Sequence, residues 1–121
     1  MKPSLKAMTA LFAWTIFVTV LSLMPDAGNH VEWIPYQDKL AHLFMYFVLS
    51  ICICQLNPKS TFRWVITAFL IACFYGFCLE CIQGAFITGR HFDYFDIIAN
   101  IIGSLTGSCL FYLSLKKDHN G

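Results

Sequence analysis

Charged residues are scarce in this sequence. Only 12% of its 121 residues are Asp, Glu, Lys or Arg, against about a quarter in a soluble domain, and 58% are hydrophobic. A chain this short cannot hide so much apolar surface in a water-soluble core, whereas lipid removes the need to do so. No basic aromatic patch, acidic tail, internal repeat or low-complexity segment occurs, and the net charge is only +1. These absences exclude nucleic acid as an expected partner and predict a single membrane domain over residues 1–121.

Four apolar runs predict an all-α integral membrane bundle of four transmembrane helices, at about residues 7–24, 40–56, 64–84 and 97–115. Run 7–24 contains no charge and is roughly 27 Å long as a helix, which is enough to cross the bilayer core. It is followed by Pro25-Asp26 rather than by a small-x-small cleavage site, so it is predicted to be a retained anchor and not a signal peptide.

The charged residues are sorted by sign between the two ends of these runs. Six of the eight basic residues lie at the termini and the middle turn: Lys2, Lys6, Lys59, Arg63, Lys116 and Lys117. Six of the seven acids lie at the other two turns: Asp26, Glu32, Asp38, Glu80, Asp93 and Asp96. With Asp118 on the basic side and Lys39 and Arg90 on the acidic side, the ends carry +5 and −4. Positively charged segments stay in the cytoplasm, so both termini are expected inside and the acidic turns outside.

Polar and small residues recur every three or four positions on three of the predicted helices. The stripes are Asp38, His42 and Tyr46, then Gly76, Glu80 and Gln83, then Asp96, Asn100, Gly103 and Gly107. Such spacing places each set on one helical face. A charged side chain facing lipid costs about 2.5–3.5 kcal/mol at the helix centre on insertion scales, so intramembrane charges usually face the bundle interior. We therefore expect the three stripes to meet in a polar cluster beneath the outer surface.

Two sequence blocks resemble the VanZ-like family. The first is Asp-Lys-x-x-His-x-x-x-Tyr at residues 38–46, and the second extends from Glu80-x-x-Gln83 through Gly89-Arg90 to Gly107. The resemblance implies a small multi-pass protein of the bacterial cytoplasmic (inner) membrane. The family's namesake accompanies glycopeptide-resistance genes and lowers sensitivity to teicoplanin, but the resemblance implies no particular reaction.

The polar residues of both blocks form the predicted ligand-binding set: Asp38, Lys39, His42, Tyr46, Glu80, Gln83, Arg90, Asp93, Asp96 and Asn100. Arginine suits bidentate phosphate binding, so Arg90 and Lys39 are expected to hold an anionic headgroup. Interfacial anchoring of the first block, and a salt-bridged cap made by Arg90 with Asp93 and Asp96, are the alternative interpretations.

Gly103 and Gly107 form a Gly-x-x-x-Gly pair, which is typical of close helix packing. Together with Gly76 they are predicted to be packing residues within one chain, and a homodimer is the alternative. Asn100 is expected to hydrogen-bond across helices beside them.

No cofactor and no metal site are predicted. His42 with Glu80 and Asp93 or Asp96 offers suitable ligand types, but the short-spaced pair His-x-x-x-His is lacking. The six cysteines all fall inside predicted spans and are interpreted as buried free thiols.

Three classes of function remain open. The favoured one is a protein whose outer pocket binds a lipid-linked or cell-envelope precursor headgroup. The second is a membrane-embedded enzyme acting on such a substrate, with Glu80 or His42 as the general acid or base. The third is a structural or transport partner.

Overall fold

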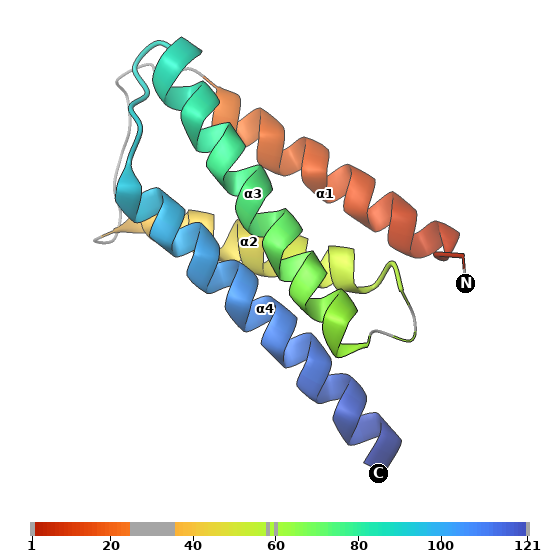
Figure 1. Cartoon of the computed structure of the whole chain (residues 1–121). Helices are drawn as coiled ribbons and strands as arrows, with labels where there is room; N and C mark the ends of the chain where they lie inside the picture. Colours follow the sequence, from red (N-terminus) through yellow and green to blue (C-terminus); the bar gives the residue numbers. More distant parts are fainter. Residues whose placement is uncertain (1, 25–35, 58, 60, 121) are drawn as a thin grey trace.

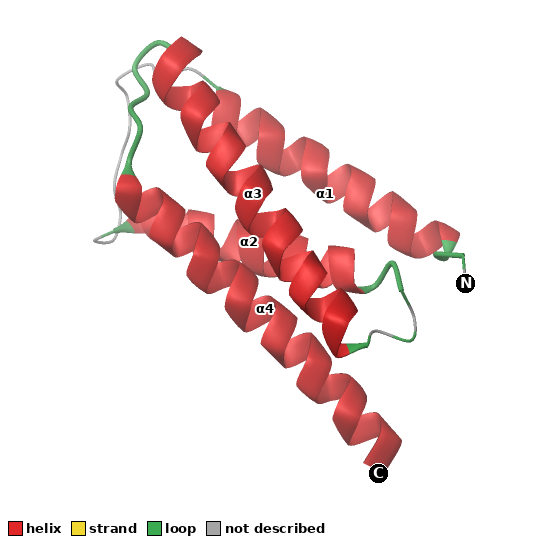
Figure 2. Cartoon of the chain, in the orientation of Figure 1, coloured by secondary structure: helices red, strands yellow, loops and turns green. Residues whose placement is uncertain are grey.

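The computed structural model describes residues 2–24, 36–57, 59 and 61–120. Within them the chain forms α1 (Leu5–Leu23), α2 (Gln37–Cys54), α3 (Phe62–Phe86) and α4 (Tyr94–Asn120), joined by loops (Figure 2). Each helix is long and apolar enough to cross a membrane. The predicted all-α bundle of four membrane-length helices is confirmed.

Each helix is longer than the apolar run that predicted it, and a polar side chain caps the start of two of them. The Ser4 hydroxyl accepts a bond from the Ala7 N–H at 3.1 Å and begins α1, and the Thr61 hydroxyl accepts from the Trp64 N–H at 3.3 Å and begins α3. Hydropathy marks only the lipid-facing part of a helix, so the predicted starts at residues 40, 64 and 97 came two or three residues late. The predicted end at residue 115 was early, because α4 continues through two lysines, which are good helix formers.

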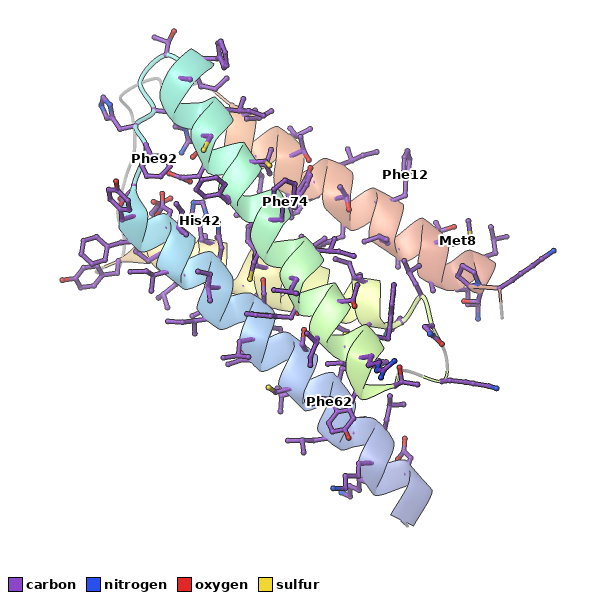
Figure 3. The ribbon with its side chains drawn as sticks, viewed as in Figure 1. Met8, Phe12, His42, Phe62, Phe74 and Phe92 are labelled. Atoms are coloured by element: carbon purple, nitrogen blue, oxygen red, sulfur yellow. The ribbon has the colours of Figure 1, made fainter. Side chains whose placement is uncertain are left out.

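The four helices run back and forth, so that both termini lie at the same end of the bundle (Figure 1). We call this the basic end; the opposite end, which carries Asp38, Glu80, Asp93 and Asp96, is the acidic end. α2 packs most extensively against α4, whereas α1 contacts α2 and α3 but not α4. α1 is therefore the least enclosed helix, and Met8 and Phe12 point away from the bundle (Figure 3).

Glycines allow the helices to approach closely within the chain. A Cβ atom at Gly103 would overlap the Leu43 carbonyl, and one at Gly107 would overlap the Phe47 carbonyl. A Cβ atom at Gly76 would lie only 2.9 Å from both the Tyr46 ring and the Asn100 amide. The Gly-x-x-x-Gly face of α4 is thus occupied by α2 of the same chain.

Candidate functional site

Polar side chains from α2, α3 and α4 lie together at the acidic end, where His42 is seen close to the start of α4 (Figure 3). Five of them are at most 6% exposed: His42, Glu80, Gln83, Asp96 and Asn100. Burying so many polar groups is costly unless they are hydrogen-bonded or paired. Their bonds therefore decide what each residue can do.

Lys39 is held by three carboxylates. Its ammonium donates to Asp93 Oδ2 and Asp96 Oδ1 at 2.6 Å each and to Asp38 Oδ2 at 3.3 Å. An ammonium has three N–H donors, and all three are used here. The Lys39 ammonium also holds the pKa of Asp93 below its usual range. The geometry thus shows Lys39 neutralising acids, and its expected contact with an anionic headgroup stays a prediction.

His42 is fixed in orientation by Asn100. The two side chains are joined by a bond of 3.1 Å between Nδ1 of His42 and Oδ1 of Asn100. An amide oxygen only accepts, so the proton lies on Nδ1. The other ring nitrogen, Nε2, lies 3.7 Å from Asp96 Oδ2 and 3.8 Å from Asp38 Oδ1.

Glu80 connects α3 to the start of α4. Its Oε1 atom accepts a bond of 2.9 Å from the backbone N–H of Asp93, and its side chain is buried. Tyr46 is also buried, in the core next to Gly76. Neither Glu80 nor Tyr46 lines the cavity described below, so His42 is the acid–base candidate that reaches it.

Arg90, in the loop before α4, lies over the carboxyl end of α1. It donates from Nε to the Met24 carbonyl at 3.0 Å and from Nη2 to the Leu21 carbonyl at 3.4 Å. The last carbonyls of a helix are unsatisfied, and a cation there is favourable. In the described part of the chain Arg90 forms no ion pair with an acid. The alternative interpretation, a salt-bridged cap of Arg90 with Asp93 and Asp96, is therefore wrong for these side chains. Both acids are paired with Lys39 instead.

A cavity of about 350 Å³ opens between α1, α2 and the end of α3. Its polar lining is Ser22, Asp38, His42, Gln83 and Arg90. Its apolar lining is Trp14, Phe17, Leu21, Ala41, Phe44 and Met45. The Gln83 side-chain amide donates to the Ser22 carbonyl and so fixes α3 against α1 at the polar side. The cavity is amphiphilic, with an apolar wall and a polar part that contains a cation.

The contribution of α1 to this cavity was missed from the sequence. Trp14, Phe17 and Ser22 lie in a run without charge or polar stripe, so no periodicity marks their face. The sequence feature that could have pointed to this face is Trp14, because a tryptophan in an apolar helix needs a partner for its N–H. In the structure that indole N–H donates to the Met45 carbonyl of α2 at 2.9 Å.

Comparison with known proteins agrees with the resemblance noted in the sequence. A model of the VanZ/LLP1 family matches residues 3–115. The chain belongs to this family. The fission yeast Schizosaccharomyces pombe has a similar protein, described as uncharacterized protein C11E3.10, which is 35% identical over 71 residues. The match includes 58% of this VanZ/LLP1 chain but only 43% of the yeast protein. No solved structure matches.

The family assignment and the four helices together indicate a multi-pass membrane protein. They do not distinguish among membranes, because a yeast protein is among the relatives. The bacterial cytoplasmic membrane therefore stays a prediction.

Proposed function

We propose that this protein binds the anionic headgroup of a membrane-anchored amphiphile in the cavity at its acidic end. The observation that carries the proposal is that Arg90 and an aromatic wall line one cavity. The amphiphile is a lipid or a lipid-linked cell-envelope precursor. Binding of such a precursor would connect the protein with glycopeptide, and specifically teicoplanin, sensitivity.

The charge on Arg90 supports this role. A guanidinium has five N–H donors, and the carbonyls of Leu21 and Met24 use only two of them. Asp93 and Asp96 pair with Lys39, and Arg90 forms no ion pair with an acid in the part of the chain that the structure describes, so no described acid competes with a ligand for the guanidinium. Arginine recognises phosphate in a bidentate manner, and this requires two adjacent N–H groups.

The apolar wall supports a lipid over a free phosphate. Trp14, Phe17 and Phe44 line the cavity, and the Trp14 ring packs against both others, with centroids 5.0 Å from Phe17 and 6.1 Å from Phe44. Such a surface can receive the hydrocarbon part of an amphiphile without burying an unpaired polar group. A small inorganic anion would gain nothing from it.

Lipid analysis tests the proposal. Wild type and the Arg90→Ala variant are purified in mild detergent, and the copurifying lipids are measured by mass spectrometry. An anionic lipid is expected in wild type and strongly depleted in Arg90→Ala, while Arg63→Ala, at the exposed basic end, retains it. An identical lipid content in all three proteins, at equal abundance, would refute the phosphate role of Arg90.

A second candidate function is catalysis on the same ligand with His42 as general base. It is favoured by one observation: His42 lines the cavity, whereas Glu80 does not. The His42→Gln variant should then lose turnover of the bound lipid and retain its copurification. Loss of both together would count against catalysis.

The charge distribution supports an outer location for the cavity. By the positive-inside rule we expect both termini in the cytoplasm and the acidic end outside. Two single variants, Asn29→Cys and Lys59→Cys, test this with a membrane-impermeant thiol reagent. The new cysteines should be labelled from opposite sides of the membrane, and labelling of the native chain, which has six cysteines of its own, is subtracted. Labelling of both from one side would contradict the topology.

A further inference from the structure

We propose that Asp38, His42 and Asp96 bind one divalent transition-metal cation of the Zn²⁺ or Mn²⁺ class. One ligand atom from each residue lies within 4.8 Å of the other two. Imidazole together with carboxylates is a donor set that such ions accept. The site goes beyond the proposed lipid binding and does not depend on it.

Lys39 binds only one oxygen of each carboxylate and leaves the other oxygen available to a metal ion. Lys39 binds Asp38 through Oδ2 and Asp96 through Oδ1. The opposite oxygens, Asp38 Oδ1 and Asp96 Oδ2, face His42 Nε2 at 3.8 and 3.7 Å. With metal–ligand bonds of about 2.1 Å, two atoms this far apart subtend roughly 120° at a shared ion. The separations of both carboxylate oxygens from the ring nitrogen therefore suit a shared ion.

His42 Nε2 provides an independent indication of a ligand. The side chain is only 7% exposed, and Nδ1 carries the proton that is donated to Asn100. The other ring nitrogen, Nε2, faces one oxygen of each of two carboxylates at 3.7 and 3.8 Å, which is longer than a hydrogen bond. A nitrogen and two carboxylate oxygens that converge at this separation leave room for a positive charge between them. A histidine whose other N–H donates to an oxygen acceptor is also the usual arrangement of a metal ligand.

The surrounding charges favour a divalent cation. The described residues at the acidic end include four carboxylates, from Asp38, Glu80, Asp93 and Asp96, and two cations, Lys39 and Arg90, of which only Lys39 pairs with the acids. Uncompensated negative charge is costly in a poorly hydrated region, so two further positive charges are stabilising. Asp38 and His42 line the cavity, which gives the ion a path to the site.

Titration with Mn²⁺, followed by electron paramagnetic resonance of the free ion, tests this site on the delipidated full chain in detergent. Mn²⁺ is the better probe because the six cysteines prefer softer metals such as Zn²⁺. We expect one Mn²⁺ per chain in wild type and an affinity at least about tenfold lower in Asp38→Asn and in His42→Gln. His91→Ala, which removes an exposed histidine near the same end, should bind as wild type does.

Asp38→Asn is the decisive variant because Asp38 is 40% exposed, so its change is expected to leave the fold intact and Lys39 paired with Asp93 and Asp96. Absence of stoichiometric Mn²⁺ in wild type, or equal affinity in wild type and Asp38→Asn, would overturn the proposal. Since no lipid is present in the titration, failure here would leave the proposed lipid binding standing, and loss of lipid binding would leave the metal site standing.

Discussion

The backbone N–H of Asp93 donates a hydrogen bond of 2.9 Å to Oε1 of Glu80, and this bond attaches the end of α3 to the start of α4. Asp93 also accepts from the Phe95 N–H through Oδ1 at 2.9 Å and binds Lys39 through Oδ2. One residue thus caps α4 and joins it to α2 and α3. The positions of Arg90 and Asp96, on either side of Asp93, depend on this junction.

Removing the Glu80 acceptor should destabilise the bundle. Glu80→Ala leaves the Asp93 N–H without its acceptor, and a lost bond of this kind costs about 1–3 kcal/mol. Glu80→Gln keeps an amide oxygen and should cost less. Thermal unfolding in detergent measures both, with Asp118→Ala at the exposed end of α4 as the control. If Glu80→Ala and wild type have the same unfolding temperature, the bond between Glu80 and Asp93 contributes nothing to stability.

Adding a methyl group at Gly103 should separate α2 from α4. The new Cβ atom would overlap the Leu43 backbone carbonyl, which cannot rotate away as a side chain does. Overpacking typically costs about 1–3 kcal/mol, so Gly103→Ala should lower the unfolding temperature and weaken the His42–Asn100 bond one turn away. Leu105→Ala, at a 48% exposed position of the same helix, should have a much smaller effect. The opposite ranking of the two variants would contradict the packing argument.

The four helices and their inward faces were predictable, because hydropathy and the 3.6-residue period depend on the sequence alone. His42 and Asn100 lie on stripes of that period, and both are buried. The acceptors that Lys39 and Arg90 bind within the cluster were not predictable from that period. Lys39 takes Asp93 and Asp96, and Arg90 takes carbonyls of α1, because the loop before α4 sets which cation is near which acceptor. Periodicity carries no information on that loop.

Removing the Lys39 ammonium should leave buried negative charge without compensation. Asp96, with a side chain only 8% exposed, loses its ion pair in Lys39→Met, and we expect a loss of about 1–3 kcal/mol, since Lys39 itself is partly exposed. The double variant Lys39→Met with Asp96→Asn should recover part of this loss, because the unpaired charge is gone. A double-mutant cycle in detergent measures the coupling between the two residues. Strictly additive losses would show that the 2.6 Å contact is not a stabilising pair.

Acid should remove the stabilising effect of the Asp93 carboxylate. Lys39 lowers the pKa of Asp93 in the folded chain below its ordinary value of about 4, so the ionised group stabilises the fold above that pH. This stabilisation is lost as the pH falls from about 4 towards the lower pKa of the folded state. Asp93→Asn retains the helix cap, since Asn caps as well as Asp. The difference in unfolding temperature between wild type and Asp93→Asn should therefore be constant between about pH 5 and 7 and shrink below about pH 4.

The Lys39→Met background provides the control for this pH profile. Lys39 is the first cause of the lowered pKa, so in that background the Asp93→Asn substitution should show a much weaker dependence on pH. A profile that is equally steep with and without Lys39 would assign the effect to another acid of the cluster. A difference that grows as the pH falls would have the wrong sign for a carboxylate held ionised, and would refute the Lys39–Asp93 pair as a source of stability.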